Sequence, residues 1–330
     1  MSNQPPRHAR GHFCRPHLSL LAWTLIIGQI ACCDALAQGR GKSQAITQPD
    51  TASAADTKDI GQDWVRMKYD AKGDPIAMQT AIVRYVPTKS AGKAGAKSVS
   101  VDLIGAVHIG DAAYYRRLNE RFKQYDALLY ELVAPEGTVV PLGRGTSNTH
   151  PIGALQNFAK DMLDLDHQLE YIDYTKPNFI HADMSPAEFE KAMADRHESF
   201  LQMYFKLMGA AMAQQSKLDA QGSTSDVDLF TALFSKDRAR RLKIILAKQL
   251  SEMESLMVSF GGEDGSAIIS ERNKKALGVL KTQLAKGKKH IGIFYGAGHL
   301  RDMDEHMRND FHMQPVSITW LTAWNLAPKP

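Results

Sequence analysis

The fold is decided by residues 98–133, whose sequence is SVSVDLIGAVHIGDAAYYRRLNERFKQYDALLYELV. Residues 98–107 are rich in Val and Ile, as is typical of a central strand. In residues 111–125 large apolar side chains recur every four positions, which predicts an amphipathic helix with Asp111 as its N-cap. Residues 127–133 form a second short apolar strand. Two strands joined by a helix form a βαβ unit, so we expect an α/β fold with a mixed, partly parallel sheet.

A similar layout recurs near the end of the chain. Residues 290–295 predict a strand, residues 303–310 a short helix and residues 315–321 a final strand. The first unit carries Gly105-Ala106-Val107-His108 after its strand, and the second carries Gly296-Ala297-Gly298-His299. We therefore predict a pseudo-repeat of strand, GxxH, helix and strand.

Other segments surround these two units. Residues 64–69 and 78–86 predict a hairpin with its turn at Gly73-Asp74-Pro75. Residues 153–261 read as a large helical insertion, and residues 270–286 as a further helix. Methionines recur at helical spacing in residues 200–212, which indicates core packing or an apolar groove for a partner or substrate.

Three residues stand out as candidates for a site. His108 and His299 each follow a strand-end glycine, where open α/β sheets bind ligands and where a histidine can bind a metal or move a proton. The two histidines are 191 positions apart, so only the fold can bring them together. Glu131 lies in an apolar strand, and a buried carboxylate needs a partner. For each of the three, the alternative is a hydrogen-bonded structural role.

Two further residues have a simpler structural interpretation. Arg272 opens a helix within Glu271-Arg272-Asn273, and it could either belong to a polar helix start or bind a carboxylate. Asp183 precedes Ser185, and together they favour a helix cap over a role in the site. The sequence contains no HExxH zinc motif, no GxSxG elbow and no P-loop.

The first 37 residues predict a cleavable signal peptide. Arg7, Arg10 and Arg15 precede an apolar run of 14 residues, 18–31, and Ala35-Leu36-Ala37 supplies a cleavage pattern. That run is shorter than the roughly 20 apolar residues of a membrane anchor. A lipid-modified Cys32 is the alternative. We expect residues 38–61 to be a flexible linker and residues 62–330 to be one α/β domain, in an exported protein that is periplasmic or secreted and has no stable membrane anchor after cleavage.

Composition limits the chemistry of the mature chain. All three cysteines lie within the predicted signal, so residues 38–330 have no thiol and no disulfide, and a metal site must use His and carboxylates. Removing residues 1–37 changes the formal charge from +4 to 37 minus 35, or +2. This near neutrality gives no support for nucleic acid or an anionic membrane as a partner. The expected partner is a peptide or small-molecule substrate.

Four segments together resemble the TraB/PrgY/GumN family, which includes the TIKI proteins. They are GAVHIGDAAYY, LLYELV, the ERN segment and FYGAGHL followed by a Trp, and the resemblance spans about residues 64–326. It implies a fold related to erythromycin-esterase-like and ChaN-like proteins. It assigns His108 and His299 as the motif histidines, Glu131 as the strand glutamate and Arg272 as the motif arginine.

The function that this resemblance implies is metal-dependent hydrolysis. In TIKI proteins the family's activity is metal-dependent cleavage of peptides, so a peptidase is expected. His108, His299 and Glu131 would bind a divalent ion such as zinc, manganese or cobalt, and Arg272 would orient the substrate or stabilise negative charge. If Glu131 is not a ligand, it is the natural general base. The alternative is a non-catalytic protein that binds or sequesters a peptide, haem or another small ligand.

Overall fold

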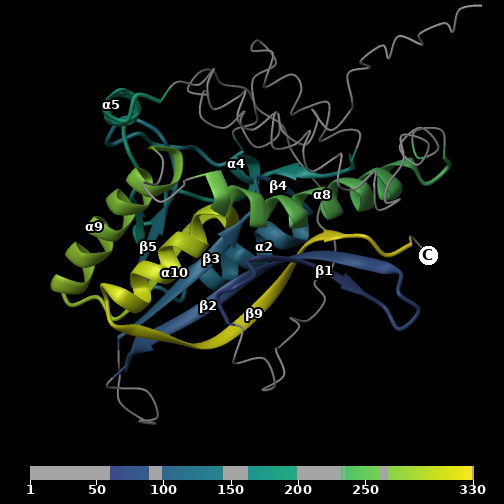
Figure 1. Ribbon diagram of the computed structural model, residues 1–330, viewed down its shortest axis with the longest axis horizontal. Coiled ribbons are helices and arrows are strands. Elements are labelled where there is room, and N and C mark those ends of the chain that lie inside the picture. The colour runs from purple at the N-terminus through teal and green to yellow at the C-terminus, as the bar shows by residue number, and fades with distance from the viewer. Residues whose placement is uncertain are drawn as a thin grey trace, which may run out of the picture.

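The computed structural model describes residues 60–88, 99–143, 163–198, 232, 235–260 and 267–328. Within them one mixed sheet has the strand order β1-β2-β3-β8-β5-β7, and β9 pairs with β2 (Figure 1). Its strands are β1 (Val65–Tyr69), β2 (Pro75–Pro87), β3 (Ser100–Ala106), β5 (Ala127–Tyr130), β7 (Phe179–His181), β8 (His290–Gly296) and β9 (Met313–Asn325). The predicted α/β class and the mixed, partly parallel sheet are confirmed.

The parallel half of the sheet contains β3, β8, β5 and β7 as neighbours in that order. Ala106 at the end of β3 pairs with Gly296 at the end of β8. β1, β3 and β9 all pair with β2 in antiparallel fashion. Because the four parallel strands run in one direction, their carboxyl ends lie along one edge of the sheet.

Helices cover both faces of the sheet. They are α2 (Ala112–Phe122), α4 (Gln168–Tyr171), α5 (Pro186–Asp195), α8 (Arg238–Phe260), α9 (Arg272–Ala285) and α10 (Leu300–Asn309). A π-helical turn, Ala267–Glu271, leads into α9, and a 3-10 turn, Ala297–His299, leads into α10. Two short strands, β4 (Ile109–Gly110) and β6 (Asp166–His167), pair with each other outside the main sheet.

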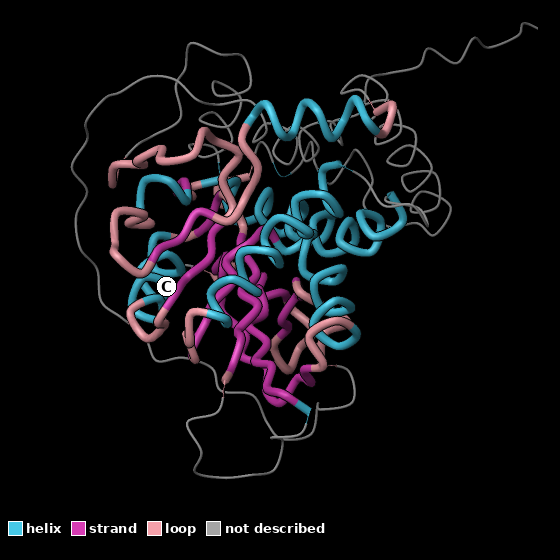
Figure 2. The backbone as a smooth tube through the Cα atoms, turned by 90° about the vertical axis from the view of Figure 1, so that its left-hand side faces the viewer, coloured by secondary structure: helices cyan, strands magenta, loops and turns pink. Residues whose placement is uncertain are grey.

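Successive residues of each central strand enter opposite cores, because side chains alternate across a pleated strand. In β3, Leu103 packs in the cluster that contains residues of α9 and α10, and Ile104 packs in the cluster that contains residues of α2 and α8. Figure 2 shows the strands running through the middle of the molecule with helices on both sides. The result is a three-layer arrangement with a buried sheet, which explains why the central strands are almost continuously apolar.

Several element boundaries differ from the sequence predictions. β5 ends at Tyr130, so Glu131 lies one residue beyond the strand rather than within it. Asp111 does occupy the N-cap position of α2, but its side chain makes no cap hydrogen bond. Its carboxylate instead accepts hydrogen bonds from Lys243 of α8 and from the backbone N–H of Asn325. Asp111 therefore ties α8 and the end of β9 to the start of α2.

The predicted helical insertion, residues 153–261, is only partly helical. β7 lies inside this range and extends the main parallel sheet by pairing with β5. A strand of three residues, Phe179–His181, is too short for periodicity to reveal it. Of the predicted cap by Asp183 and Ser185, only the part of Ser185 is confirmed, because Ser185 and Glu188 form a reciprocal capping box at the start of α5. The predicted helix through 242–260 is confirmed as α8, whereas the Met-rich residues 200–212 lie outside the described residues.

The described residues begin within the predicted linker, at Ile60. Ile60 is buried, and its carbonyl accepts a hydrogen bond from Arg308 of α10. The predicted signal, residues 1–37, and the preceding part of the linker lie outside the described residues. In the part of the chain that is described, no helix combines the length and the apolar character needed to cross a membrane.

Candidate functional site

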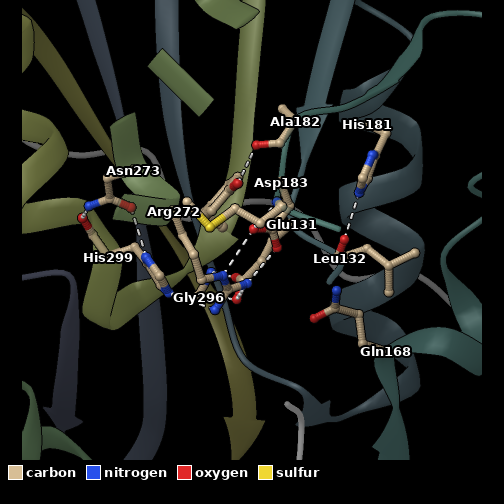
Figure 3. A network of polar contacts seen from close by, with 12 residues as sticks. Glu131, Leu132, Gln168, His181, Ala182, Asp183, Arg272, Asn273, Gly296 and His299 are labelled. Atoms are coloured by element: carbon tan, nitrogen blue, oxygen red, sulfur yellow. Dashed lines mark hydrogen bonds and ion pairs between the residues drawn. The ribbon is translucent and has the colours of Figure 1, made fainter. Parts of the chain in front are cut away.

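Each of the four parallel strands is followed within three residues by a polar side chain of one cluster. His108 follows β3, His299 follows β8, Glu131 follows β5 and Asp183 follows β7. Because the four strands are adjacent and parallel, these residues lie at the same edge of the sheet. Arg272, the first residue of α9, reaches into this edge from the covering helix layer (Figure 3).

Arg272 is at the centre of the cluster. Its Nε and Nη2 atoms donate to the two carboxylate oxygens of Asp183, at 2.9 and 2.5 Å. Nη2 also donates to Oε1 of Glu131 at 2.7 Å. Arg272 and Asp183 are only 5% and 1% exposed, so this is a buried ion pair with bidentate geometry. One guanidinium thus faces two carboxylates.

Glu131 is held at both carboxylate oxygens. Oε1 accepts from Arg272, and Oε2 accepts from the backbone N–H of Gly296 at 2.6 Å (Figure 3). Burial opposes ionisation of Glu131, but the positive charge of Arg272, the interactions with His299 and His108 and the hydrogen bond from Gly296 together hold the pKa of this carboxyl well below its usual range. Glu131 is therefore ionised at neutral pH. A carboxylate with so low a pKa is a poor proton acceptor but an adequate metal ligand.

His299 has a defined orientation that follows from Asn273. The amide nitrogen of Asn273 donates to the carbonyl of His299 at 3.0 Å and to Asp302 at 2.7 Å, so its Oδ1 must accept from Nδ1 of His299, at 2.7 Å. This arrangement leaves Nε2 of His299 with a lone pair, 3.6 Å from Oε1 of Glu131. Burial lowers the pKa of His299 to about 4, although Glu131 acts in the opposite direction. The imidazole is therefore neutral at neutral pH.

His108 approaches the same point from β3. A Cβ atom built on Gly296 would lie 3.8 Å from Nε2 of His108, 3.8 Å from Cδ2 of His299 and 3.2 Å from Oε2 of Glu131. The glycine thus leaves room for three side chains to meet over its backbone. Burial lowers the pKa of His108, and the negative charge of Glu131 partly opposes that effect. His108 is partly buried as a residue, whereas His299 is 5% exposed.

The structure brings together all four site residues predicted from the sequence: His108, Glu131, Arg272 and His299. It corrects the interpretation of Asp183, because Ser185 caps α5 alone and Asp183 instead binds Arg272 and the backbone N–H of Met184. The available signal was its position just after a short apolar run, the same context as Glu131.

Asn273 was missed as a site residue even though it belongs to the ERN segment. It is fully buried in the first turn of α9, beside Arg272. Its role depends on contacts with His299, which lies 26 positions away in the sequence, so no local pattern could reveal it.

The chemical types of the side chains suit a divalent metal ion, but their spacing in the structure does not yet form a metal site. Two neutral imidazoles and an ionised carboxylate supply the lone pairs that such ions bind. Among the described residues, however, no three His, Cys, Asp or Glu side chains are already gathered as a metal site. Arg272 occupies space next to Glu131, and its Nη1 lies 3.4 Å from Nε2 of His299. A bound ion would have to draw His108, His299 and Glu131 closer together.

Comparison of the chain with protein-family models, with curated proteins and with solved structures found no match.

Proposed function

We propose that the mature chain is an exported hydrolase that acts on a carbonyl substrate, most simply a peptide, with a divalent metal ion held by His108, His299 and Glu131. The observation that carries this proposal is the convergence of these three side chains over Gly296, at the carboxyl edge of the parallel strands. The resemblance of the two GxxH motifs, the strand glutamate and the ERN segment to the TraB/PrgY/GumN family adds support.

The charge state of the cluster supports binding of a cation. Both histidines have lowered pKa values and are neutral, so each keeps one ring lone pair at neutral pH, although that of His299 accepts a 3.4 Å hydrogen bond from Nη1 of Arg272. Two carboxylates, Glu131 and Asp183, face the single positive charge of Arg272. The cluster therefore carries a net negative charge, and an electropositive ligand would relieve it.

The residues of the chain divide into distinct roles in this proposal. When bound, a divalent ion would polarise the substrate carbonyl and lower the pKa of water. His108 and His299 would each give their single ring lone pair to the ion, so neither is assigned as the proton acceptor, and the proton of the attacking water would pass to the leaving group. Glu131 is assigned as a ligand rather than as the base, because its pKa is well below the range of an effective proton acceptor.

Arg272 takes a different role from direct substrate recognition. Arg272 is 5% exposed, and its guanidinium donates hydrogen bonds to Asp183, Glu131 and His299. These contacts support a positioning role, in which Arg272 fixes Glu131 and keeps it ionised. Asp183 in turn fixes the guanidinium plane through two hydrogen bonds.

The test is a cleavage assay on purified residues 38–330 with a mixed peptide library, read by mass spectrometry, with and without a chelator. We expect cleavage that is lost with chelator and restored by zinc, manganese or cobalt. His108→Ala and His299→Ala should each abolish cleavage. His312→Asn is the matched control, because His312 is exposed, lies outside the cluster and has a positive φ of 51° that Asn tolerates.

The possible failures separate the parts of the proposal. Cleavage that survives chelator but is lost in His108→Ala would contradict the metal and retain the hydrolase. Saturable peptide binding without cleavage under any metal would contradict hydrolysis and favour the binding alternative. Equal activity in wild type and both histidine variants would mean that the site lies elsewhere.

A further inference from the structure

Gln168 is attached to the backbone of His108 although 60 positions separate them. The N–H of Gln168 donates to the carbonyl of His108 at 2.9 Å. The flanking residues reinforce this contact, because His167 in β6 pairs with Ile109 in β4. The small β4–β6 sheet thus holds the start of α4 directly against the residue that follows the first GxxH motif.

The side chain of Gln168 is buried beside His108 and has one committed partner. Gln168 is 7% exposed, and its Nε2 donates to the hydroxyl of Tyr174 at 2.6 Å. Its Oε1 is buried, and no group among the described residues bonds to it with good hydrogen-bond geometry. A buried amide oxygen without a partner is unfavourable, so a nearby donor is expected.

The His108 ring is the candidate donor to this oxygen, because Gln168 is bonded to the backbone of His108. The Gln168 side chain acts to raise the pKa of His108, as a hydrogen-bond acceptor does. Nε2 of His108 lies near Gly296, 3.8 Å from the position of a Cβ atom built on that glycine, and Oε2 of Glu131 lies 3.2 Å from the same position. With Nε2 assigned to the Gly296 side, Nδ1 is the ring nitrogen assigned to Gln168.

The second histidine of the cluster has the same arrangement in fully formed geometry. Oδ1 of Asn273 accepts from Nδ1 of His299, and Nε2 of His299 is left toward Glu131. Each histidine is thus oriented by a neutral amide rather than by a carboxylate. A neutral acceptor fixes the tautomer without adding another negative charge to a cluster that already has two carboxylates.

We propose that Gln168 is a positioning residue for His108, whose Oε1 accepts the Nδ1 proton and leaves Nε2 free for the ligand or proton of the site. This inference rests on the proposed function for its catalytic meaning. The tautomer itself is a property of the folded chain, with or without turnover.

The primary test is the tautomer of His108 in metal-free residues 38–330 labelled with ¹⁵N-histidine. Two-bond ¹H–¹⁵N correlation spectra distinguish a protonated Nδ1 from a protonated Nε2, and the missing signals of His108→Asn assign the residue. We expect the Nδ1–H tautomer in the wild type and a mixture of tautomers in Gln168→Leu. Tyr174→Phe is the matched control: it removes the other partner of the same amide but keeps Oε1, so the Nδ1–H tautomer should persist.

The tautomer measurement overturns the proposal in either of two ways. A wild-type His108 protonated on Nε2 contradicts it directly, even if Gln168→Leu does not fold. An unchanged tautomer in a folded Gln168→Leu also contradicts it. Absence of peptide cleavage would contradict the proposed function alone and would leave these spectra interpretable.

Activity supplies a second readout if the chain hydrolyses peptides. Loss of an outer partner of a metal-binding histidine lowers metal affinity or activity by about 10- to 100-fold. We expect a loss of that size in kcat for Gln168→Leu, with little change in KM, and no such loss in Tyr174→Phe, which keeps the acceptor oxygen of Gln168. A KM effect alone, or an equal loss in Tyr174→Phe, would contradict the positioning role.

Discussion

The guanidinium of Arg272 binds both carboxylate oxygens of Asp183 inside the protein, and the same Nη2 atom also reaches Glu131. This relationship joins α9 to the ends of β7 and β5. It leaves the two carboxylates dependent on one cation for their charge balance.

We therefore expect Arg272→Met to destabilise the fold by roughly 3–5 kcal/mol, because it leaves a buried carboxylate without its counter-ion. Urea unfolding at pH 7 measures this change. Lys275→Met is the control: its ion pair with Glu188 is 40% and 48% exposed at the two side chains, and exposed pairs contribute about 0–1 kcal/mol. Similar effects of the two substitutions would contradict the buried network.

The contact between Asn273 and His299 predicts a second effect. Asn273→Leu removes the acceptor of Nδ1 and the donor to the His299 carbonyl, so we expect a loss of about 1–3 kcal/mol in stability and a mixed His299 tautomer. Asp302→Ala removes the other acceptor of the Asn273 amide and should keep the tautomer. The same ¹⁵N-histidine spectra measure it, and an unchanged tautomer in Asn273→Leu would rule out the assigned orientation.

The low pKa of His299 makes stability depend on pH. The unfolded imidazole titrates near 6.5 and the folded one at about 4, so between these values the unfolded state binds more protons. The contribution of neutral His299 to the free energy of unfolding should be fully present above about pH 6.5. It should decrease by roughly 3 kcal/mol as the pH falls to 4, because each pKa unit corresponds to about 1.36 kcal/mol. His108 acts in the same direction. Urea titrations in chelator measure this slope, and constant stability from pH 6.5 to 4.5 would be the contrary result.

Glu131→Gln separates two roles of that carboxylate. It keeps the shape but removes the charge, so we expect turnover to fall by at least 100-fold. Metal content, measured on the purified variant, should fall with it because the depressed pKa favours a ligand over a base. Retained metal with lost turnover would instead indicate the base. Glu120→Gln, in an exposed pair with Lys123, serves as the control for loss of a carboxylate.

The predicted signal peptide also predicts the first residue of the mature protein. We expect N-terminal sequencing of the exported chain to begin at Gln38, after Ala35-Leu36-Ala37. A blocked or lipid-modified Cys32 would favour the alternative, and a full-length chain would mean that no cleavage occurs. The thermal midpoint of residues 38–330 should not change with a thiol reductant, since they contain no cysteine.

The sequence by itself determined the βαβ unit of residues 98–133, the antiparallel hairpin before it and the strand that ends at Gly296, because each depends on local periodicity and turn residues. It also identified His108, Glu131 and His299, since polar residues at apolar strand ends are visible without a structure, whereas Arg272 was assigned through the resemblance of the ERN segment. Asp183 was visible in the same context, but its neighbour Ser185 made a cap the simpler interpretation.

Only the tertiary structure decided which of these residues meet and what each one holds. β7 became a strand because β5 offers it a parallel edge, and this pairing is what places Asp183 beside Arg272. The roles of Asn273 and Gln168 likewise arise from contacts across 26 and 60 positions. Hydrogen bonds and ion pairs of this kind depend on distance and direction in space, which hydrophobic periodicity along one chain does not encode.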